Sequence, residues 1–255
     1  MKIIYSKRFE GKYPANPVES PDRVRLPASE LWDYEFIEPS AALLDDITSV
    51  HSKEHVDRVK AKGLFDPASL AAGGAITAAE LAMNGEAAFA LIRPPGHHAA
   101  YNRSWGMCCF NNMVIAVKRI RPRAKRALII DIDLHFGDGT VSIFRGDLNV
   151  KIVNPGSIDL DCDYLSLDSS GYMQQIEDSF RGFDFDVVGV SAGFDTYLED
   201  WGGMLSISDY REIGRMIREG SERSKRCSGR RFAILEGGYH PDLKYCVKSF
   251  VKGFG

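Results

Sequence analysis

The sequence predicts an α/β fold: a single three-layer αβα domain over residues 1–255 with a mostly parallel central sheet. Six short runs rich in apolar residues alternate along the chain with longer segments of helical spacing. Several of these runs are apolar on both faces, as strands buried in a parallel sheet are. The chain contains no internal repeat and no linker-like stretch rich in proline and serine, so we assign its whole length to one domain.

The predicted strands and helices share this alternating order. The strands are KIIYS (2–6), AAFALIR (87–93), RALIIDID (126–133), LNVKIVN (148–154), FDVVGVSAG (185–193) and RFAILEGG (231–238). The helical segments are residues 42–63, 67–85, 111–121, 172–182 and 206–225, several of which end at glycine. A parallel sheet connected in this way carries helices on both of its faces.

Composition and charge argue against several classes of function. With 44% hydrophobic residues, 26% charged residues and a net charge of −3, the chain offers no basic face for nucleic acid. The basic run KRIRPRAKR (118–126) fits the solvated end of a helix and its loop, and a patch for a partner is the alternative. The start of the chain lacks the apolar region of a signal peptide, and no apolar run reaches membrane length.

Cysteine usage predicts a reducing compartment, the cytoplasm. The cysteines are odd in number and none stand in a CxxC pair, so the chain suggests neither a disulfide framework nor a thiolate zinc site. They are Cys108, Cys109, Cys162, Cys227 and Cys246.

Side chains able to do chemistry follow four of the predicted strands. In chain order they are His97 and His98, then Asp131, Asp133 and His135, then Asp195, and finally Tyr239. Ligands bind beyond the carboxyl ends of the strands in sheets of this kind. Four such ends meeting at one edge are hard to explain by packing alone.

The segment DIDLHFGDGT (131–140) predicts a metal site. Asp131, Asp133 and His135 stand at i, i+2 and i+4, so an extended backbone would point all three to one side. Crowded carboxylates repel unless a cation or a proton lies between them, although a calcium-like loop or a helix cap at GDGT would also explain the pattern. With Asp195 as a third donor, Asp133 and His135 make an Asp₂His site with an open position; Zn²⁺ is the default ion, and Fe²⁺ or Co²⁺ would suit the same ligands.

The pair His97–His98 could handle protons beside such a metal, although an isolated HH dipeptide is also typical of a polar turn. Two anionic ligands cancel the charge of a dication, so water there is less acidic than at an all-histidine site and a general base becomes useful. One imidazole can take the proton from water, and the other can steady or protonate the leaving group. Asp131 and Asp138 are the nearby carboxylates left to fix the two tautomers.

The segment LEGGY (235–239) places a phenol after two glycines. Gly237 and Gly238 would let the backbone pass close to a ligand, and Tyr239 could donate a hydrogen bond to a developing oxyanion. A turn followed by a packed aromatic side chain is the alternative.

Taken in order, RPPGHHA, DIDLHFGDGT, SAGFDTY and LEGGY resemble the zinc-dependent histone deacetylase family. Its superfamily also holds acetylpolyamine amidohydrolases and acetoin-utilisation proteins on an arginase-like α/β fold. SVHSKEHV (49–56) and GMCCFNNMVIA (106–116) add to the similarity, which runs from about residue 49 to residue 239. The resemblance implies that Asp133, His135 and Asp195 are the zinc ligands.

The resemblance also implies roles for the other residues. His97 would pair with Asp131 and His98 with Asp138, with His98 as the general base, while Tyr239 would polarise the substrate carbonyl. A K⁺ ion is implied near the backbone of Asp131, Asp133 and His135. Gly106 and Met107 would lie along the acyl-lysine tunnel, and Asp66 would either hold substrate amides or cap a helix.

Two departures from the family pattern concern the mouth of the site. Met107 stands where the family usually has a phenylalanine, and methionine lines an apolar slot less rigidly. The segment between Asp138 and Asp195 is short and has no Gly-Phe-Phe-Pro-like loop to supply the facing aromatic wall. We therefore expect a shallower mouth, unless a second subunit of a homo-oligomer closes it.

The function that follows is a metal-dependent amidohydrolase that removes an acetyl or other acyl group from an acylated primary amine, such as acetyl-lysine or an acetylpolyamine. An arginase-type ureohydrolase is one alternative, but that chemistry uses two manganese ions and more bridging carboxylates. A catalytically silent protein that binds acylated ligands is the other. Such a protein need not keep His97, His98 and Tyr239 together.

Overall fold

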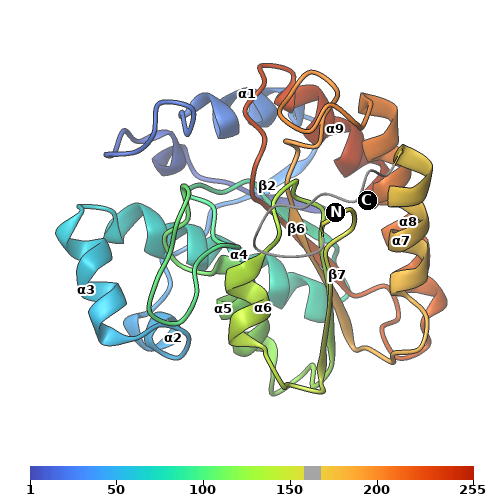
Figure 1. The fold of residues 1–255 in the computed structure, drawn as a ribbon, viewed down its shortest axis with the longest axis horizontal. Coiled ribbons are helices and arrows are strands. Elements are labelled where there is room, and N and C mark those ends of the chain that lie inside the picture. Colours follow the sequence, from blue (N-terminus) through green and yellow to red (C-terminus); the bar gives the residue numbers. More distant parts are fainter. Residues whose placement is uncertain (158–167) are drawn as a thin grey trace.

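One parallel sheet runs through the protein, with helices on both sides of it (Figure 1). The computed structural model describes residues 1–157 and 168–255. Its strands are β1 (Lys2–Ile4), β2 (Glu35–Ile37), β3 (Ala88–Ala90), β4 (Ala127–Asp131), β5 (Val150–Val153), β6 (Val187–Ala192) and β7 (Arg231–Leu235). In the described ranges these seven strands pair in parallel in the order β2-β1-β3-β7-β6-β4-β5. The predicted fold class is confirmed.

Six of the seven strands lie inside the predicted runs, and β2 is the exception. The residues of β2 are exposed or half-buried, and they are too few to show an apolar period. The strand exists because it pairs with β1, with Lys2 opposite Glu35, at the edge of the sheet. Such a pairing cannot be seen in three residues of sequence.

The helices form two layers. They are the 3₁₀ helix η1 (Lys7–Glu10) and the α-helices α1 (Asp22–Glu30), α2 (Leu44–Thr48), α3 (Lys53–Ala61), α4 (Phe65–Met83), α5 (Asn112–Ile120), α6 (Asp138–Ile143), α7 (Ser169–Ser179), α8 (Ile207–Arg223) and α9 (Leu243–Phe254). The helix α4 packs on β3 and β7 and against α5, while α1, α9, α8 and α7 pack against one another in a row (Figure 1).

The prediction of one helical segment over residues 42–63 was wrong. The structure has two helices there, α2 and α3, separated by residues 49–52. Ser52 causes the second start, because its hydroxyl accepts a hydrogen bond from the backbone N–H of His55 at 3.1 Å. The helices α1, α6 and α9 are not among the predicted segments.

The strand order explains why the chemistry-bearing loops meet. The strands β3, β7, β6 and β4 are successive neighbours in the sheet, so their carboxyl ends lie side by side. Every residue in these four strands is buried, as the runs apolar on both faces predicted. The loops that follow these strands therefore start from a rigid, dry base.

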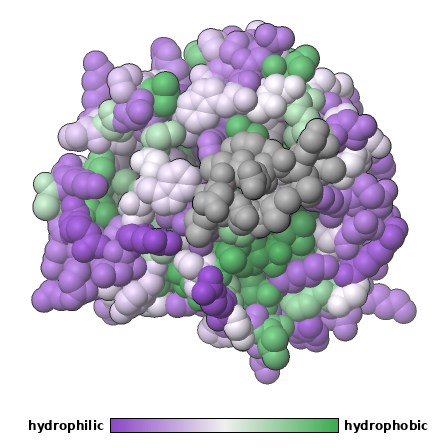
Figure 2. Space-filling model, viewed as in Figure 1, coloured by the Kyte–Doolittle hydropathy of each residue, from purple (hydrophilic) through white to green (hydrophobic). Residues whose placement is uncertain are grey.

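Hydrophilic residues cover most of the face seen in Figure 2, and hydrophobic residues show nearer its centre. In the part of the chain that the structure describes, no helix combines the length and the apolar character that a membrane crossing needs.

Candidate active site

The two adjacent histidines lie in the loop after β3, and both are buried. The chain turns at this point instead of remaining extended, so the imidazole rings of His97 and His98 lie together, with centroids 3.9 Å apart. His97 Nδ1 lies 3.1 Å from Asp131 Oδ2, and His98 Nδ1 lies 2.8 Å from Asp138 Oδ1. The structure thus brings together both of the predicted His–Asp pairs.

The two imidazoles differ in charge although they are neighbours. Burial disfavours the charged form of His97, but the carboxylates of Asp133 and Asp131 outweigh it and raise the pKa of His97 well above its usual value. Burial and the nearby charge of His97 lower the pKa of His98 to about 4. At neutral pH His98 is therefore an uncharged base beside a cationic His97.

The segment after β4 is bent, not extended as predicted. The bends at residues 133–135 come from carboxylates that accept backbone N–H groups: Asp133 Oδ1 accepts from His135 at 2.9 Å, and Asp195 Oδ1 accepts from Leu134 at 3.0 Å. Asp131 consequently turns to His97, whereas Asp133 and His135 turn to Asp195. The i, i+2, i+4 spacing does not point all three side chains to one place.

Asp133, His135 and Asp195 bring three ligand atoms within 4.8 Å of one another. His135 Nδ1 lies 3.2 Å from Asp133 Oδ1 and 3.1 Å from Asp195 Oδ2. Asp195 Oδ2 is buried, and His135 Nδ1 is its ion-pair neighbour, but no donor among the described residues reaches it with hydrogen-bond geometry, which is costly unless a cation satisfies it. This donor set fits a dication with an open coordination position.

Two glycines make room for these carboxylates. A Cβ atom on Gly193 would lie 2.3 Å from Asp133 Oδ2, and one on Gly237 would lie 2.5 Å from the same atom. The backbone N–H of Gly237 donates to Asp133 Oδ2 at 2.8 Å. The predicted close approach of the backbone at Gly237 is therefore toward the metal-ligand set.

The electrostatics of this set favour a cation. Burial and the charge of Asp133 raise the pKa of Asp195 to about 6. Burial opposes the charged form of His135, but the carboxylates of Asp133 and Asp195 beside it prevail and raise its pKa to about 10. The two carboxylates thus stabilise a positive charge at His135, and a bound dication would neutralise their negative charge in the same way.

A pocket of about 140 Å³ opens onto these groups. It is lined by Pro95, His97, His98, Trp105, Gly106, Met107, Cys108, Asp133, His135, Trp201, Gly237 and Tyr239. Gly106 and Met107 lie in its wall, as the resemblance implied, but Gly238 does not. Gly238 has a φ of +112°, and a Cβ there would meet Leu243 and Phe194, so it serves the turn. Asp66 is exposed in the first turn of α4 and is not among the lining residues.

Two tryptophans, which the sequence reasoning missed, form aromatic walls in this pocket. Trp105 stacks on His98 with centroids 3.6 Å apart, and its Nε1 donates to Asp138 Oδ1 at 3.0 Å. Trp201, from the loop after β6, stacks on Tyr239 with centroids 4.3 Å apart. We expected no aromatic wall from the segment between Asp138 and Asp195. That segment includes residues 158–167, which lie outside the described residues. The structure supplies aromatic side chains from elsewhere.

Tyr239 shares this pocket with the histidine pair. Its backbone N–H donates to Asp200 Oδ2 at 2.6 Å, and the guanidinium carbon of Arg23 lies 4.8 Å from its ring centroid. Burial raises the pKa of Tyr239, so its hydroxyl remains a neutral hydrogen-bond donor.

Glu236 is a second residue that the sequence reasoning missed. It is fully buried, and its Oε2 accepts the backbone N–H groups of Gly96 at 2.7 Å and His97 at 3.1 Å. Burial raises its pKa to about 7. The only sequence signal was an acidic residue directly after the apolar run of residues 232–235. Glu236 ties the loop that carries the histidine pair to the strand that leads to Tyr239.

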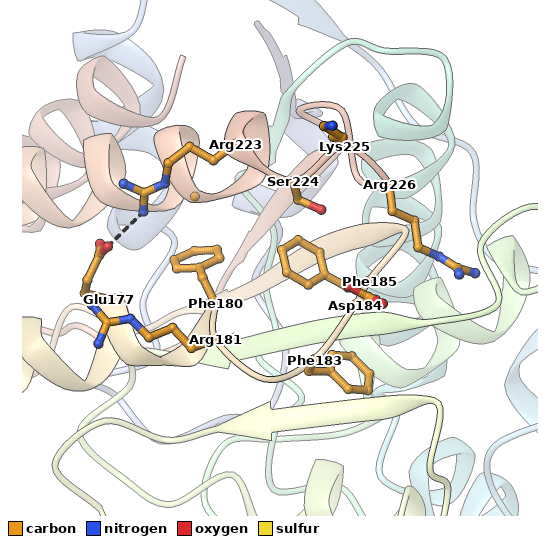
Figure 3. A pocket seen from close by; sticks show the side chains of 11 residues that line it. Glu177, Phe180, Arg181, Phe183, Asp184, Phe185, Arg223, Ser224, Lys225 and Arg226 are labelled. Carbon is orange, nitrogen blue, oxygen red and sulfur yellow. Dashed lines mark hydrogen bonds and ion pairs between the residues drawn. The ribbon is translucent and has the colours of Figure 1, made fainter.

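A larger hollow, of about 570 Å³, lies before the starts of β6 and β7, at the opposite end of the sheet from this pocket (Figure 3). Phe180 and Phe185 form its centre, and the basic side chains at its rim extend outward, with Arg223 paired to Glu177 at 2.9 Å. The clusters of potential metal ligands found among the described residues lie instead around the smaller pocket. The smaller pocket is therefore the candidate active site.

Comparison with known proteins identifies the family of this chain. The family description "Histone deacetylase domain" matches residues 17–155. A protein named "Probable deacetylase" from Methanothermobacter thermautotrophicus is 32% identical, over 95% of this chain and 86% of its own length. Another of that name, from Archaeoglobus fulgidus, is 33% identical over 80% of this chain and 68% of its own length.

Solved structures agree on the fold. The acetylpolyamine aminohydrolase from Burkholderia pseudomallei superposes with a TM-score of 0.85 at 21% identity, over 100% of this chain and 98% of that one. These findings favour a deacetylase over the arginase-type and silent-binder alternatives. The chain belongs to the histone deacetylase family and is a hydrolytic deacetylase.

Proposed function

We propose that this protein is a zinc-dependent amidohydrolase that removes an acetyl group from an acylated primary amine, such as acetyl-lysine or an acetylpolyamine. One observation supports it above the others. The buried Asp195 Oδ2, which accepts no hydrogen bond among the described residues, lies with Asp133 and His135 beside a pocket that also holds the His97–His98 pair and Tyr239. This combination provides metal ligands, a proton acceptor and an oxyanion donor at one place.

Asp133, His135 and Asp195 would hold the metal. A Zn²⁺ ion there would polarise the amide carbonyl and make water more acidic, and Fe²⁺ or Co²⁺ would do the same. We also propose, from the family resemblance, a K⁺ ion near the backbone of Asp131, Asp133 and His135.

His98 is the proposed general base. Because its Nδ1 faces Asp138 Oδ1 at 2.8 Å, the proton sits on Nδ1 and the lone pair on Nε2 is free to accept the proton of the attacking water. Its lowered pKa keeps it uncharged at neutral pH. Trp105 shares the same Asp138 oxygen and stacks on the ring, which fixes the imidazole plane.

His97 and Tyr239 have complementary tasks. The carboxylates of Asp133 and Asp131 raise the pKa of His97, which favours its protonated form; that form would stabilise negative charge developing in the pocket and could protonate the departing amine. The Tyr239 hydroxyl donates a hydrogen bond to the carbonyl oxygen as that oxygen becomes an oxyanion.

The pocket walls suit a straight aliphatic chain. Trp105, Met107 and Trp201 line a volume of about 140 Å³, which matches the methylene stem of an acylated lysine or polyamine better than a bulky group. We also propose that residues 1–255 act as one catalytic domain. A cytoplasmic location is supported by the four cysteines of the described ranges, all of which are free and buried.

The direct test is deacetylation by the purified protein. The protein is stripped of metal, reloaded in parallel with Zn²⁺, Fe²⁺ or Co²⁺, and supplied with an acetyl-lysine peptide or an acetylpolyamine. We expect release of acetate and of the free amine only after metal is restored. Equal rates with and without metal, or no release from either substrate, would refute the proposal.

A further inference from the structure

A second hollow, of about 270 Å³, lies between α3 and the loop that leads to Trp105. It is lined by His55, Arg58, Val59, Lys62, Asn102, Arg103 and Ser104. Arg58, Lys62 and Arg103 all carry positive charge, and none of the lining residues is acidic, in a chain whose net charge is −3. The hollow is therefore electropositive in an otherwise slightly acidic protein.

Hydrogen bonds fix two of the lining side chains, Arg58 and Asn102. Asn102 Oδ1 accepts from Ser52 Oγ at 2.5 Å and from Arg58 Nη2 at 3.0 Å, so both acceptor positions of the amide are used. The same Arg58 nitrogen also donates to the Asn102 backbone carbonyl. What Asn102 can still offer is its Nδ2 amide group, which only donates. Three cations, an amide and the Ser104 hydroxyl thus surround one small volume.

His55 closes the inner side of this hollow, with its ring packed edge-on against Phe110. Its side chain is 2% exposed, and its Nε2 lies 2.8 Å from the Cys109 carbonyl, so that nitrogen carries the proton and donates. Its Nδ1 is buried and has no hydrogen-bond partner among the described residues. An atom so fully covered is out of reach of a ligand in the hollow, so the cations and donors of the other lining residues carry the binding.

We propose that this hollow binds a phosphate group, either as the free ion or as part of a ligand. Phosphate oxygens match a set of donors and cations, because each oxygen can accept charge-assisted hydrogen bonds. A phosphate dianion brings more charge and more acceptor oxygens to three cations than a carboxylate does. The site is linked to the candidate active site by sequence, because Asn102, Arg103 and Ser104 directly precede Trp105.

Binding of inorganic phosphate to the whole protein tests the site directly. Titration calorimetry should show saturable binding, and Lys62→Gln/Arg103→Gln should weaken it by about tenfold or more, since each lost charge-assisted hydrogen bond contributes on this order. Lys53→Gln/Lys60→Gln is the matched control. Like the test variant, it removes two positive charges, but both come from α3. Neither residue lines the hollow, and helical periodicity places both on the opposite face of the helix.

The control double variant should bind phosphate within about twofold of the unsubstituted protein. Equal weakening in the two double variants would mean a diffuse electrostatic effect and would overturn the proposal, as would the absence of saturable binding. Nuclear magnetic resonance of the histidine rings gives a second measurement. Phosphate should shift the His55 signals and leave those of His240 in place, and unchanged His55 signals would also overturn the proposal.

Kinetics then separate the two sources of the phosphate group. If the group belongs to a substrate, free phosphate should raise the KM of an acetyl-lysine peptide carrying phosphoserine and leave a neutral peptide unaffected. If the free ion is the ligand, the neutral peptide should respond. The binding measurements do not require deacetylation, so they can fail while the proposed function stands, and the reverse also holds.

Discussion

Replacing Tyr239 by phenylalanine removes one hydroxyl group and leaves the ring in place. The ring contacts Trp201, at 4.3 Å between centroids, and Arg23, at 4.8 Å from the guanidinium carbon, and phenylalanine keeps both contacts. The turn is held by the backbone N–H of Tyr239 on Asp200 Oδ2, not by the hydroxyl. No described residue makes a hydrogen bond with that hydroxyl, so the free energy of unfolding should change by less than about 0.5 kcal/mol.

The effect of this substitution on catalysis should be much larger. In the proposed reaction the Tyr239 hydroxyl bonds to a carbonyl oxygen that gains negative charge as water attacks. A substrate that fills the pocket of about 140 Å³ between the tryptophan walls would displace water from it, which strengthens such a bond. Loss of one oxyanion donor lowers turnover by about 10²–10³-fold, or ~2.7–4 kcal/mol of transition-state stabilisation. Ground-state binding weakens less, so kcat should fall more than KM rises.

The assay is steady-state kinetics on an acetylated amine, with metal content and urea unfolding measured on the same preparations. Tyr245→Phe is the matched control, because it is the same chemical change at an exposed position on α9. It should leave kcat, KM and metal content unchanged. A Tyr239→Phe variant with full kcat and full metal content would show that Tyr239 is only a packed aromatic side chain, and would refute its proposed role.

Three further predictions follow from the same geometry. Asp195→Ala should lose metal and activity together with the sheet still folded, because a three-ligand site cannot spare one ligand; full metal occupancy, measured by elemental analysis, would contradict the assignment. His98→Ala should lower kcat by ~10²–10⁴-fold with metal retained, and loss of the metal would instead make His98 a ligand. Burial lowers the pKa of His51 to about 3, and its Nδ1 faces the Ala100 carbonyl while its Nε2 accepts from the Asn111 N–H. Below pH ~6.5 His51 is protonated in the unfolded chain but stays neutral in the folded one. The free energy of unfolding should therefore be about 2 kcal/mol lower at pH 5 than at pH 7 because of this residue. His51→Gln should flatten that slope in urea unfolding measured at both pH values, and an unchanged slope would rule out His51 as its source.

Local patterns in the sequence were enough for the fold class and for grouping most of the residues that the structure brings together at the candidate site. A strand apolar on both faces must be covered on both faces, so runs such as AAFALIR and RFAILEGG required a buried parallel sheet. Polar residues directly after those runs had to lie at the carboxyl edge. This is why His97, His98, Asp133, His135 and Tyr239 could be grouped before any contact was known.

The expectations that failed depended on contacts between distant segments. The strand β2 is defined by its pairing with β1, and the break between α2 and α3 by the Ser52 cap. The backbone at Asp131, Asp133 and His135 is bent and not extended as expected. One cause is that Asp195, 61 residues further along the chain, accepts a hydrogen bond from the Leu134 backbone N–H.

Tertiary structure alone decided how the site is closed and aligned. Trp105 and Trp201 have no spacing in the sequence that marks them as pocket walls, and Glu236 reaches Gly96 across 140 residues of chain. Sequence spacing encodes which face of one strand or helix a side chain occupies. It does not encode which strands become neighbours. The order β3-β7-β6-β4 brings these loops together, and that order depends on pairing and burial between segments far apart in the chain.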